Sequence, residues 1–274
     1  MIAITGANGN LGKATIRFLL KKTEPGSIIA IVRDPATMEG SDVQVRRADY
    51  ENLDSLNAAF KGVDKLLQIS ATSMGQEGIR QETNVVRAAM QQEVKHIVYT
   101  GSIKPSVLAN FYATHQALAT ERAILSSGIT YTFLRNSLYM EIIPLFMGNA
   151  LEKGHWEYPA GNGKVSFVSR QDIAEALANV LTEKGHENKV YEISGGKAYT
   201  FADTARLLNI TYSDVPNAYL EKGLAAAHLP EELISCMVSM VDGIRANEFA
   251  YVEKDLEYLL HRRPLSFENY LSNL

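Results

Sequence analysis

The first twelve residues constrain the fold more than any other part of the chain. A short apolar run, Ile2 to Ile4, is followed by Thr5-Gly6-Ala7-Asn8-Gly9-Asn10-Leu11-Gly12 and then by a helical pattern. In this spacing the first glycine permits a tight turn, the second lets backbone approach a pyrophosphate, and the third lets the helix pack closely on its strand. The free N–H groups at the start of such a helix favour phosphate. The segment therefore predicts a dinucleotide-binding strand-turn-helix unit.

The first half of the chain repeats this alternation of short β-rich runs with longer helical patterns. Such a rhythm predicts an α/β fold of the Rossmann type, a doubly wound parallel sheet covered by helices. The second crossover, residues 35–42, is unusually short. The expected strands are Ile2–Ile4, Ser27–Val32, Val43–Arg47, Lys65–Ile69, His96–Thr100 and Tyr131–Leu134, and the expected helices are Leu11–Lys22, Leu53–Phe60, Glu82–Gln91 and Ala113–Ser126.

The rhythm changes after Arg135. We expect a helix at Glu141–Leu151, strands at Lys164–Ser169 and Lys189–Ile193, and mostly helices from Thr200 onward. No linker rich in Pro, Gly or Ser separates the two halves. We therefore predict a dinucleotide-binding Rossmann domain over residues 1–135. A smaller, mostly helical substrate lobe follows over residues 136–274, with some of its elements returning to the sheet.

Composition excludes several classes of function. The 274 residues carry a net charge of -4 without a basic stripe, so no nucleic-acid ligand is expected. No apolar segment approaches the length of a membrane span, and the N-terminus has no signal-peptide pattern, so we expect a cytoplasmic protein that does not bind membranes. The single cysteine, Cys236, cannot form an internal disulfide, and six dispersed histidines suggest no metal site. A homodimer is left open.

The residue that ends the second strand meets the adenosine ribose and so bears on cofactor choice. Arg33 occupies this position, where a guanidinium can pair with the 2'-phosphate of NADP(H). Asp34 follows at once and weakens the argument, so NAD(H) stays as the less favoured alternative. Asp49, after the third strand, is interpreted either as a carboxylate at the adenine rim or as a turn-forming residue.

The proton-handling residues are harder to identify. Reductases of this architecture commonly use a tyrosine and a lysine four residues apart on a helix, and no tyrosine here has a lysine at that spacing. The polar side chains that remain near the carboxyl edge of the sheet are candidates to line a pocket: Thr100, Ser102, Tyr112, His115, Asn136 and Tyr139. His115 either donates a proton or simply faces water, and Tyr139 either contacts a flat substrate or only packs. Hydride addition to a quinone yields a stabilised product, so alignment of the reactants can supply much of the catalysis.

Four segments together resemble one known family. TGANGNLG at the N-terminus, IVRDP at the second strand, YTFLRNSLY after the sixth strand and VSRQDIAEALANVL downstream resemble the NmrA-like group of atypical short-chain dehydrogenases. Within it the chain is similar to the branch of bacterial quinone oxidoreductases and triphenylmethane reductases. The resemblance implies an NAD(P)H-dependent oxidoreductase with a small electrophilic acceptor. It also implies a cofactor site that includes Gly6, Asn8, Gly9, Asn10, Leu11, Gly12, Arg33, Ser70, Ala71, Thr72, Gly75, Ser137, Leu138 and Tyr139.

One departure from the family pattern bears on mechanism. The branch places a histidine or lysine four residues before a helix glutamate, and counting back from Glu121 reaches Ala117, with His115 two residues out of frame. This favours direct hydride transfer or no catalysis at all. The leading hypothesis is a reductase of a flat electrophile such as a quinone. The alternative is a non-catalytic regulator that senses NADP(H) through a protein partner, and a sugar-nucleotide epimerase is weakened by the missing tyrosine-lysine pair.

Overall fold

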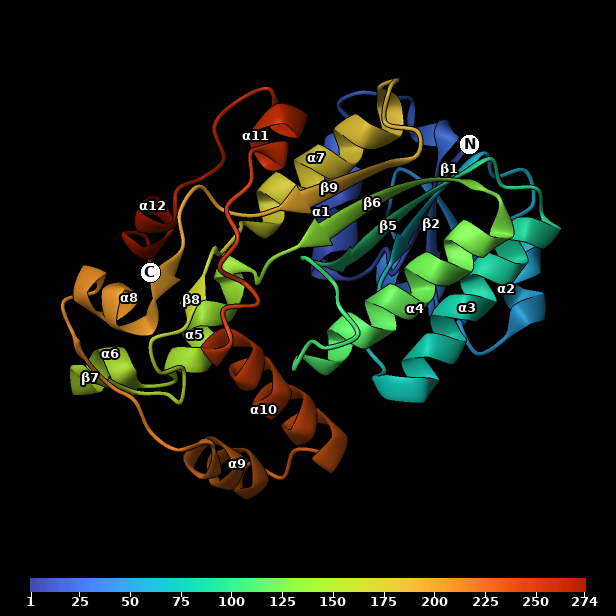
Figure 1. Cartoon of the computed structure of the whole chain (residues 1–274). Coiled ribbons are helices and arrows are strands. Elements are labelled where there is room, and N and C mark those ends of the chain that lie inside the picture. Colours follow the sequence, from blue (N-terminus) through green and yellow to red (C-terminus); the bar gives the residue numbers. More distant parts are fainter. The chain divides into compact units, whose positions relative to one another are not determined.

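The computed structural model describes residues 1–274 and contains two compact units, each built from several stretches of the chain (Figure 1). Unit 1 comprises Met1–Ser102, Gln116–Arg135 and Arg170–Tyr191. Unit 2 comprises Ile103–His115, Asn136–Ser169 and Glu192–Leu274. The chain therefore leaves unit 1 and returns to it twice.

A seven-stranded sheet in the order β3-β2-β1-β4-β5-β6-β9 organises unit 1. The register-matched pairs β1–β2, β1–β4, β2–β3 and β4–β5 are all parallel, so the carboxyl ends of these strands meet at one edge. This strand order confirms the expected α/β Rossmann-type fold. The strands are β1 (Ile2–Thr5), β2 (Ile28–Val32), β3 (Gln44–Arg47), β4 (Lys65–Ile69), β5 (His96–Ser102), β6 (Thr130–Asn136) and β9 (Lys189–Ile193).

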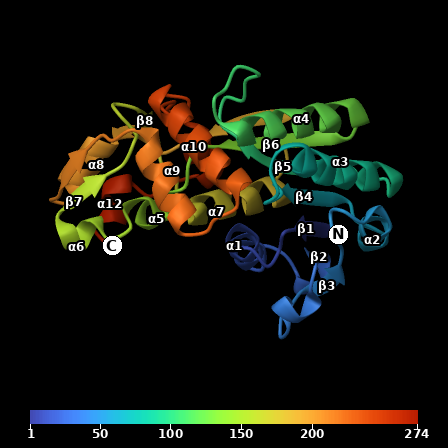
Figure 2. The same cartoon turned by 90° about the horizontal axis from the view of Figure 1, so that it is seen from below.

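Helices cover both faces of this sheet, which is why its central strands are almost wholly apolar. Every residue of β2 is buried. Helices α1 and α7 pack together on one face, and α2, α3 and α4 lie side by side on the other (Figures 1 and 2). The crossover between β2 and β3 contains only the short 3-10 turn η2 (Pro35–Met38). Another 3-10 turn, η1 (Pro25–Ser27), comes directly before β2. The helices are α1 (Asn10–Leu19), α2 (Leu53–Ala59), α3 (Gly75–Gln91), α4 (Tyr112–Ser127) and α7 (Arg170–Thr182).

Unit 2 combines short strands with helices. Strands β7 (His155–Glu157) and β11 (Thr211–Ser213) pair in parallel, and β8 (Lys164–Val165) pairs antiparallel with β10 (Tyr199–Thr200). An isolated parallel bridge joins Tyr139 to Val168. The helical elements are η3 (Met140–Ile142), α5 (Ile143–Met147), α6 (Ala150–Lys153), α8 (Phe201–Leu207), α9 (Asn217–Ala226), α10 (Glu231–Arg245), α11 (Asp255–Leu260) and α12 (Phe267–Leu271).

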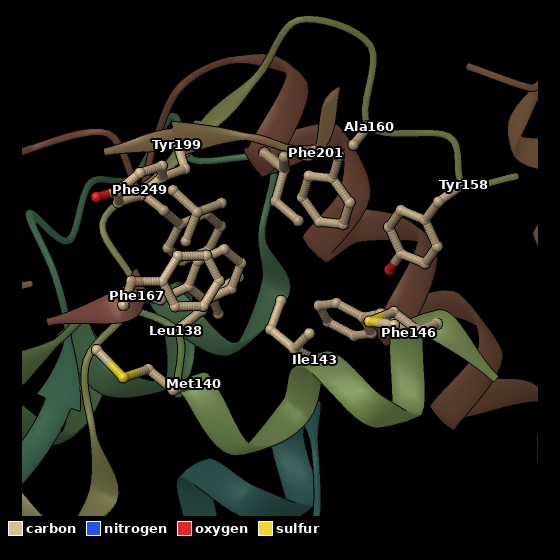
Figure 3. Close-up of a cluster of buried hydrophobic side chains, with 14 of the residues drawn as sticks. Leu138, Met140, Ile143, Phe146, Tyr158, Ala160, Phe167, Tyr199, Phe201 and Phe249 are labelled. Carbon is tan, nitrogen blue, oxygen red and sulfur yellow. The ribbon is translucent and has the colours of Figure 1, made fainter. Parts of the chain in front are cut away.

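Aromatic side chains fill the core of unit 2. The rings of Tyr158 and Phe201 are parallel, with centroids 4.9 Å apart, and Phe146 stacks on Tyr158 at 5.0 Å (Figure 3). Trp156 packs on Phe201 at 4.9 Å and donates its indole N–H to the carbonyl of Phe146. Each buried aromatic ring removes a large apolar area from water, so a few of them suffice to hold these short elements together.

The largest differences between expected and observed elements occur at three places. The helix expected at Glu141–Leu151 is replaced by η3, α5 and α6, and Gly148, which adopts a φ of +52°, separates α5 from α6. The strand expected at Lys164–Ser169 forms a continuous ladder only over β8, and beyond it Val168 forms the isolated bridge with Tyr139. Helix α3 is longer than expected and begins at Gly75 rather than Glu82. The sequence prediction missed its first turns because they are polar and carry no apolar periodicity.

Candidate functional site

The predicted site residues divide cleanly between the two units. Three groups of predicted cofactor-binding residues follow strands of the sheet in unit 1. They form the glycine turn, the predicted adenosine site and the loop after the fourth strand. The residues expected beside the reacting atoms belong to unit 2. Unit 1 contains Gly6, Asn8, Gly9, Asn10, Leu11, Gly12, Arg33, Asp49, Ser70, Ala71, Thr72, Gly75 and Thr100, and unit 2 contains His115, Asn136, Ser137, Leu138 and Tyr139.

The glycine turn has the close backbone packing that a dinucleotide cradle requires. Gly6 has a φ of +60°, and its carbonyl accepts the N–H of Gly9 at 3.0 Å. A Cβ at Gly12 would lie 2.5 Å from the Gly6 oxygen and 2.7 Å from the Ala7 Cα. Since both are backbone atoms, no residue with a side chain fits at Gly12 without opening the turn.

The N-terminus of α1 retains its capacity to bind an anion. Its N-cap residue, Gly9, supplies no side-chain hydrogen bond, and no acidic residue occupies the first turn. Gly9 and Asn10 are exposed, whereas Leu11 and Gly12 are buried. The unpaired amides and the positive end of the helix dipole therefore favour a phosphate at this position.

The two residues expected at the adenosine end differ in their surroundings. Arg33 directly follows β2, is exposed, and forms no hydrogen bond or ion pair within the chain. Asp49 is half-buried, and its Oδ1 accepts the backbone N–H of Glu51 at 3.0 Å. Arg33 is therefore available to a ligand, while Asp49 already stabilises a turn through one carboxylate oxygen.

The loop after β4 is fastened at its first two residues. The hydroxyl of Ser70 donates to the carbonyl of Thr100, and the Ser70 N–H donates to the Thr100 hydroxyl at 3.3 Å. The N–H of Ala71 donates to the carboxylate of Glu82 at 2.8 Å. The loop is thereby tied to β5 and α3, and its position at the sheet edge depends on both.

Glu82 was not among the predicted site residues, yet it organises this part of unit 1. Its carboxylate is fully buried and accepts four hydrogen bonds, all from neutral groups. One oxygen accepts Ala71 N and Gln116 Nε2, each at 2.8 Å, and the other accepts Tyr99 and Thr120 hydroxyls, each at 2.7 Å. Burial and the Glu82 carboxylate raise the pKa of Tyr99, so this phenol stays a hydrogen-bond donor.

One sequence signal could have found Glu82. It lies on the face of α3 that is otherwise buried through Gly78, Val85, Val86 and Ala89. An acidic residue on the apolar face of an amphipathic helix requires buried donors, because an unpaired charge there is strongly unfavourable. The pattern predicts a polar cluster, although it does not say which residues supply the donors.

Asn136 stands out among the residues of unit 2. It is the last residue of β6 and only 6% exposed, and neither its side-chain oxygen nor its nitrogen has a hydrogen-bond partner. Its backbone is paired, since its carbonyl accepts the N–H of Ile103 at 3.0 Å. A buried amide with both polar atoms unsatisfied costs free energy unless a ligand completes it.

The neighbours of Asn136 are held by backbone pairing. Ser137 N donates to Ile193 O at 2.8 Å, and Val168 N donates to Leu138 O at 3.0 Å. Tyr139 is half-buried and forms its bridge with Val168. Ser137 to Tyr139 therefore form an extended segment that is held by backbone pairing on both sides.

The helix position that the family pattern reserves for a proton-handling residue is filled by an apolar one. Ala117 is buried on α4. Glu121 binds Arg135 through both oxygens, with Nε 2.9 Å from one and Nη2 2.7 Å from the other. His115 is exposed near the start of α4. None of these residues brings a proton donor to Ala117.

Unit 2 also contains a cavity of about 600 Å³. Its volume suits a drug-sized molecule, and its wall mixes aliphatic and acidic side chains with one aromatic ring. The lining comes from the segment before α4, from the first residue of α4, and from α9 and α10. Of these, only α9 and α10 fall in the predicted substrate lobe. The lining residues are Ala109, Asn110, Tyr112, Glu221, Ala225, Glu231, Ile234, Ser235, Val238, Ser239 and Asp242.

Comparison with known proteins establishes the family. The model of the NmrA-like family matches residues 1–270. Quinone oxidoreductase 2 of Escherichia coli (strain K12) is 38% identical over 242 residues, which cover 85% of this chain and 84% of that protein. The chain therefore belongs to the NmrA-like family, as the sequence motifs indicated.

Two solved structures with bound cofactor resemble the whole chain. An E. coli NADPH-dependent quinone oxidoreductase complexed with NADPH has a TM-score of 0.94 at 34% identity and covers 100% of this chain and 99% of its own. Triphenylmethane reductase of Citrobacter sp. complexed with NADP(H) has a TM-score of 0.92 at 36% identity and the same coverage. Both relatives are reductases by name, so the alternative of a non-catalytic regulator is not favoured.

Proposed function

We propose that this protein is an NADPH-dependent oxidoreductase that transfers hydride to a small, flat electrophile such as a quinone. The observation that carries the proposal is the glycine turn, whose close packing at Gly12 leaves a backbone cradle at an uncapped helix N-terminus. Membership of the NmrA-like family and the likeness to NADPH-dependent reductases support the same conclusion. Bound NADPH supplies the hydride, and the protein supplies binding and orientation.

In this proposal the residues of unit 1 hold the cofactor's phosphates and adenosine. The amides of the turn bind the pyrophosphate, and Arg33 binds the 2'-phosphate as a guanidinium fork. The loop from Ser70 to Gly75, anchored by Thr100 and Glu82, lines the site, and Asp49 lies at the adenine rim. Of these contacts, only Arg33 distinguishes NADPH from NADH.

The residues of unit 2 have the orienting roles. Asn136 completes its unsatisfied amide by hydrogen bonding to a polar group of the bound ligands. Tyr139, carried with Ser137 and Leu138 on the paired segment, contacts the flat acceptor, and His115 protonates the reduced acceptor from the exposed side. Because Ala117 offers no acid, hydride transfer proceeds without a protein proton donor at that helix position.

The remaining parts of the proposal concern partners and compartment. None of the helices combines the length and apolar composition that a membrane-spanning segment needs. A cytoplasmic location is supported by the single cysteine, Cys236, which is buried and forms no disulfide. The net charge of -4 supports a small molecule rather than a nucleic acid as the ligand. A homodimer is a prediction that sedimentation tests.

The direct test is consumption of NADPH by the purified protein with a panel of quinones, azo dyes and cationic dyes. We expect turnover with at least one acceptor and a preference for NADPH over NADH. Tight NADPH binding without consumption with any acceptor would overturn the enzyme proposal. Equal loss of NADPH and NADH affinity in Arg33→Ala would overturn the assignment of the 2'-phosphate to Arg33.

Asn136→Leu tests the orienting role. Removing an amide that has no partner in the free protein should leave the free energy of unfolding unchanged or slightly higher. The same change should lower kcat/KM about tenfold, equivalent to roughly 1.4 kcal/mol. Asn84→Leu is the matched control, since Asn84 Nδ2 donates to the carbonyl of Tyr50 at 3.0 Å. This variant should lower the free energy of unfolding and leave kcat/KM unchanged.

A further inference from the structure

A second arginine lies beside Arg33 at the sheet edge. In the β2–β3 register Val32 is the partner of Arg47, and the N–H of Ala48 donates to the carbonyl of Val32 at 3.0 Å. Arg33 follows Val32, and Arg47 precedes Ala48, so this one hydrogen bond joins their two backbones. Both arginines are exposed.

The alternation of β3 gives the direction of Arg47. Arg46 Nη1 donates to the carbonyls of Ala59, the last residue of α2, and Lys61 at 2.8 and 2.7 Å. Its register partner, Ile31, belongs to the core under α2 and α3. Since successive side chains of a strand point to opposite faces, Arg47 points to the face that α1 covers. The glycine turn and α1 therefore lie on the face to which Arg47 points.

Neither guanidinium is engaged within the chain. Arg33 and Arg47 form no hydrogen bond or ion pair, in contrast to Arg46. The nearby acids are occupied locally, because Asp34 Oδ1 accepts Ala36 N at 3.1 Å and Asp49 Oδ1 accepts Glu51 N at 3.0 Å. Two like charges on adjacent strand ends repel each other, so they gain stability from an anion bound between them.

The local charge balance shows why one arginine is insufficient. With Arg33 alone, the carboxylates of Asp34 and Asp49 would leave this corner net negative and would repel a phosphate. Arg47 brings the corner to neutrality and adds a second planar set of donors that matches phosphate oxygens.

We propose that Arg47 is a second specificity residue, which binds the 2'-phosphate of NADPH together with Arg33. The inference rests on the proposed function, in which NADPH is the cofactor and Arg33 meets its 2'-phosphate. It adds a residue at the end of β3 to a recognition site that the sequence placed only at the end of β2.

The test is a set of dissociation constants for NADPH, NADH and adenosine 2'-monophosphate, measured on wild type and on Arg33→Ala, Arg47→Ala, Arg47→Lys and the double alanine variant. Arg47→Ala should weaken NADPH and adenosine 2'-monophosphate about tenfold and NADH less than about twofold. Arg47→Lys should recover part of the loss, and the double variant should bind NADPH and NADH almost equally. Arg87→Ala, an exposed arginine of α3 without a partner, is the matched control and should change nothing.

The outcomes separate the two proposals. Wild-type NADPH affinity in Arg47→Ala, or an equal loss for NADPH and NADH, overturns the role of Arg47. If Arg33→Ala also leaves the NADPH preference intact, the proposed 2'-phosphate site itself is wrong. If Arg33→Ala loses the preference for NADPH over NADH and Arg47→Ala keeps it, the proposed function stands and only the role of Arg47 is wrong.

Discussion

A buried polar cluster in unit 1 contrasts with a buried aromatic cluster in unit 2. In unit 1 the Glu82 carboxylate lies in the interior with four hydrogen-bond donors around it, and the buried His96 and His186 are hydrogen-bonded as well. In unit 2 the core is a stack of aromatic rings, within which the Tyr158 hydroxyl has no partner. Unit 1 thus fixes the ends of its strands through directional bonds, while unit 2 is held by shape and apolar area. Substitutions and a change of pH test this contrast.

Gly12→Ala should have the largest effect, because it opens the turn on which unit 1 presents its amides. The new Cβ would lie 2.5 Å from the Gly6 oxygen. We expect a loss of about 1–3 kcal/mol of unfolding free energy and roughly a 100-fold loss of NADPH affinity, measured by denaturation and fluorescence titration. Gly26→Ala, where a Cβ would meet nothing within 4 Å, is the control. Wild-type affinity in Gly12→Ala would contradict the cradle.

Acid should weaken the fold through His96 of unit 1. Burial lowers the pKa of His96 to about 4, whereas in the unfolded chain it titrates near 6.5. Below about pH 6.5 the unfolded state therefore binds more protons, and stability falls as pH falls. From about pH 7.5 to about pH 5 this histidine alone removes roughly 2 kcal/mol of unfolding free energy.

His96→Gln supplies the control for this pH dependence. Thr132 Oγ1 donates to the carbonyl of His186 at 2.6 Å, so His96 Nε2 donates to Thr132 Oγ1 at 2.8 Å, a bond that a glutamine amide can replace. The variant should show a flatter stability profile in urea titrations at the two pH values. An unchanged profile would show that other groups dominate the acid response.

A pair of matched tyrosine variants compares the two cores directly. Tyr99→Phe removes a donor from Glu82 and should cost about 1–2 kcal/mol, whereas Tyr158→Phe removes a hydroxyl without a partner and should change stability by less than about 0.5 kcal/mol. Thermal unfolding of the two variants measures the difference. Equal costs would mean that the contrast between the units does not extend to energetics.

The features that sequence predicted are those set by local rules. The glycine turn, the strand positions and Arg33 follow from conformational freedom, residue periodicity and position after a strand. The roles of Glu82 and Asn136 could be recognised only in the structure. Glu82 depends on hydrogen-bond donors from segments distant in the chain, and Asn136 is notable because no such segment supplies its side chain with a partner. The paired strands β7 and β11 were missed because three residues carry too little periodicity to detect. The break at Gly148 was missed because it interrupts an otherwise helical run.

The late position of α7 and β9 in the chain has a consequence for biosynthesis. Helix α1 packs against α7, and Lys65 Nζ donates to the carbonyl of Leu181 at 2.8 Å, so residues from the first third of the chain wait for a partner made much later. Until β9 leaves the ribosome, β6 remains an open sheet edge and α1 exposes its apolar side. A nascent chain stalled or truncated after Arg135 should therefore aggregate and require a chaperone, even though it already contains the entire glycine turn.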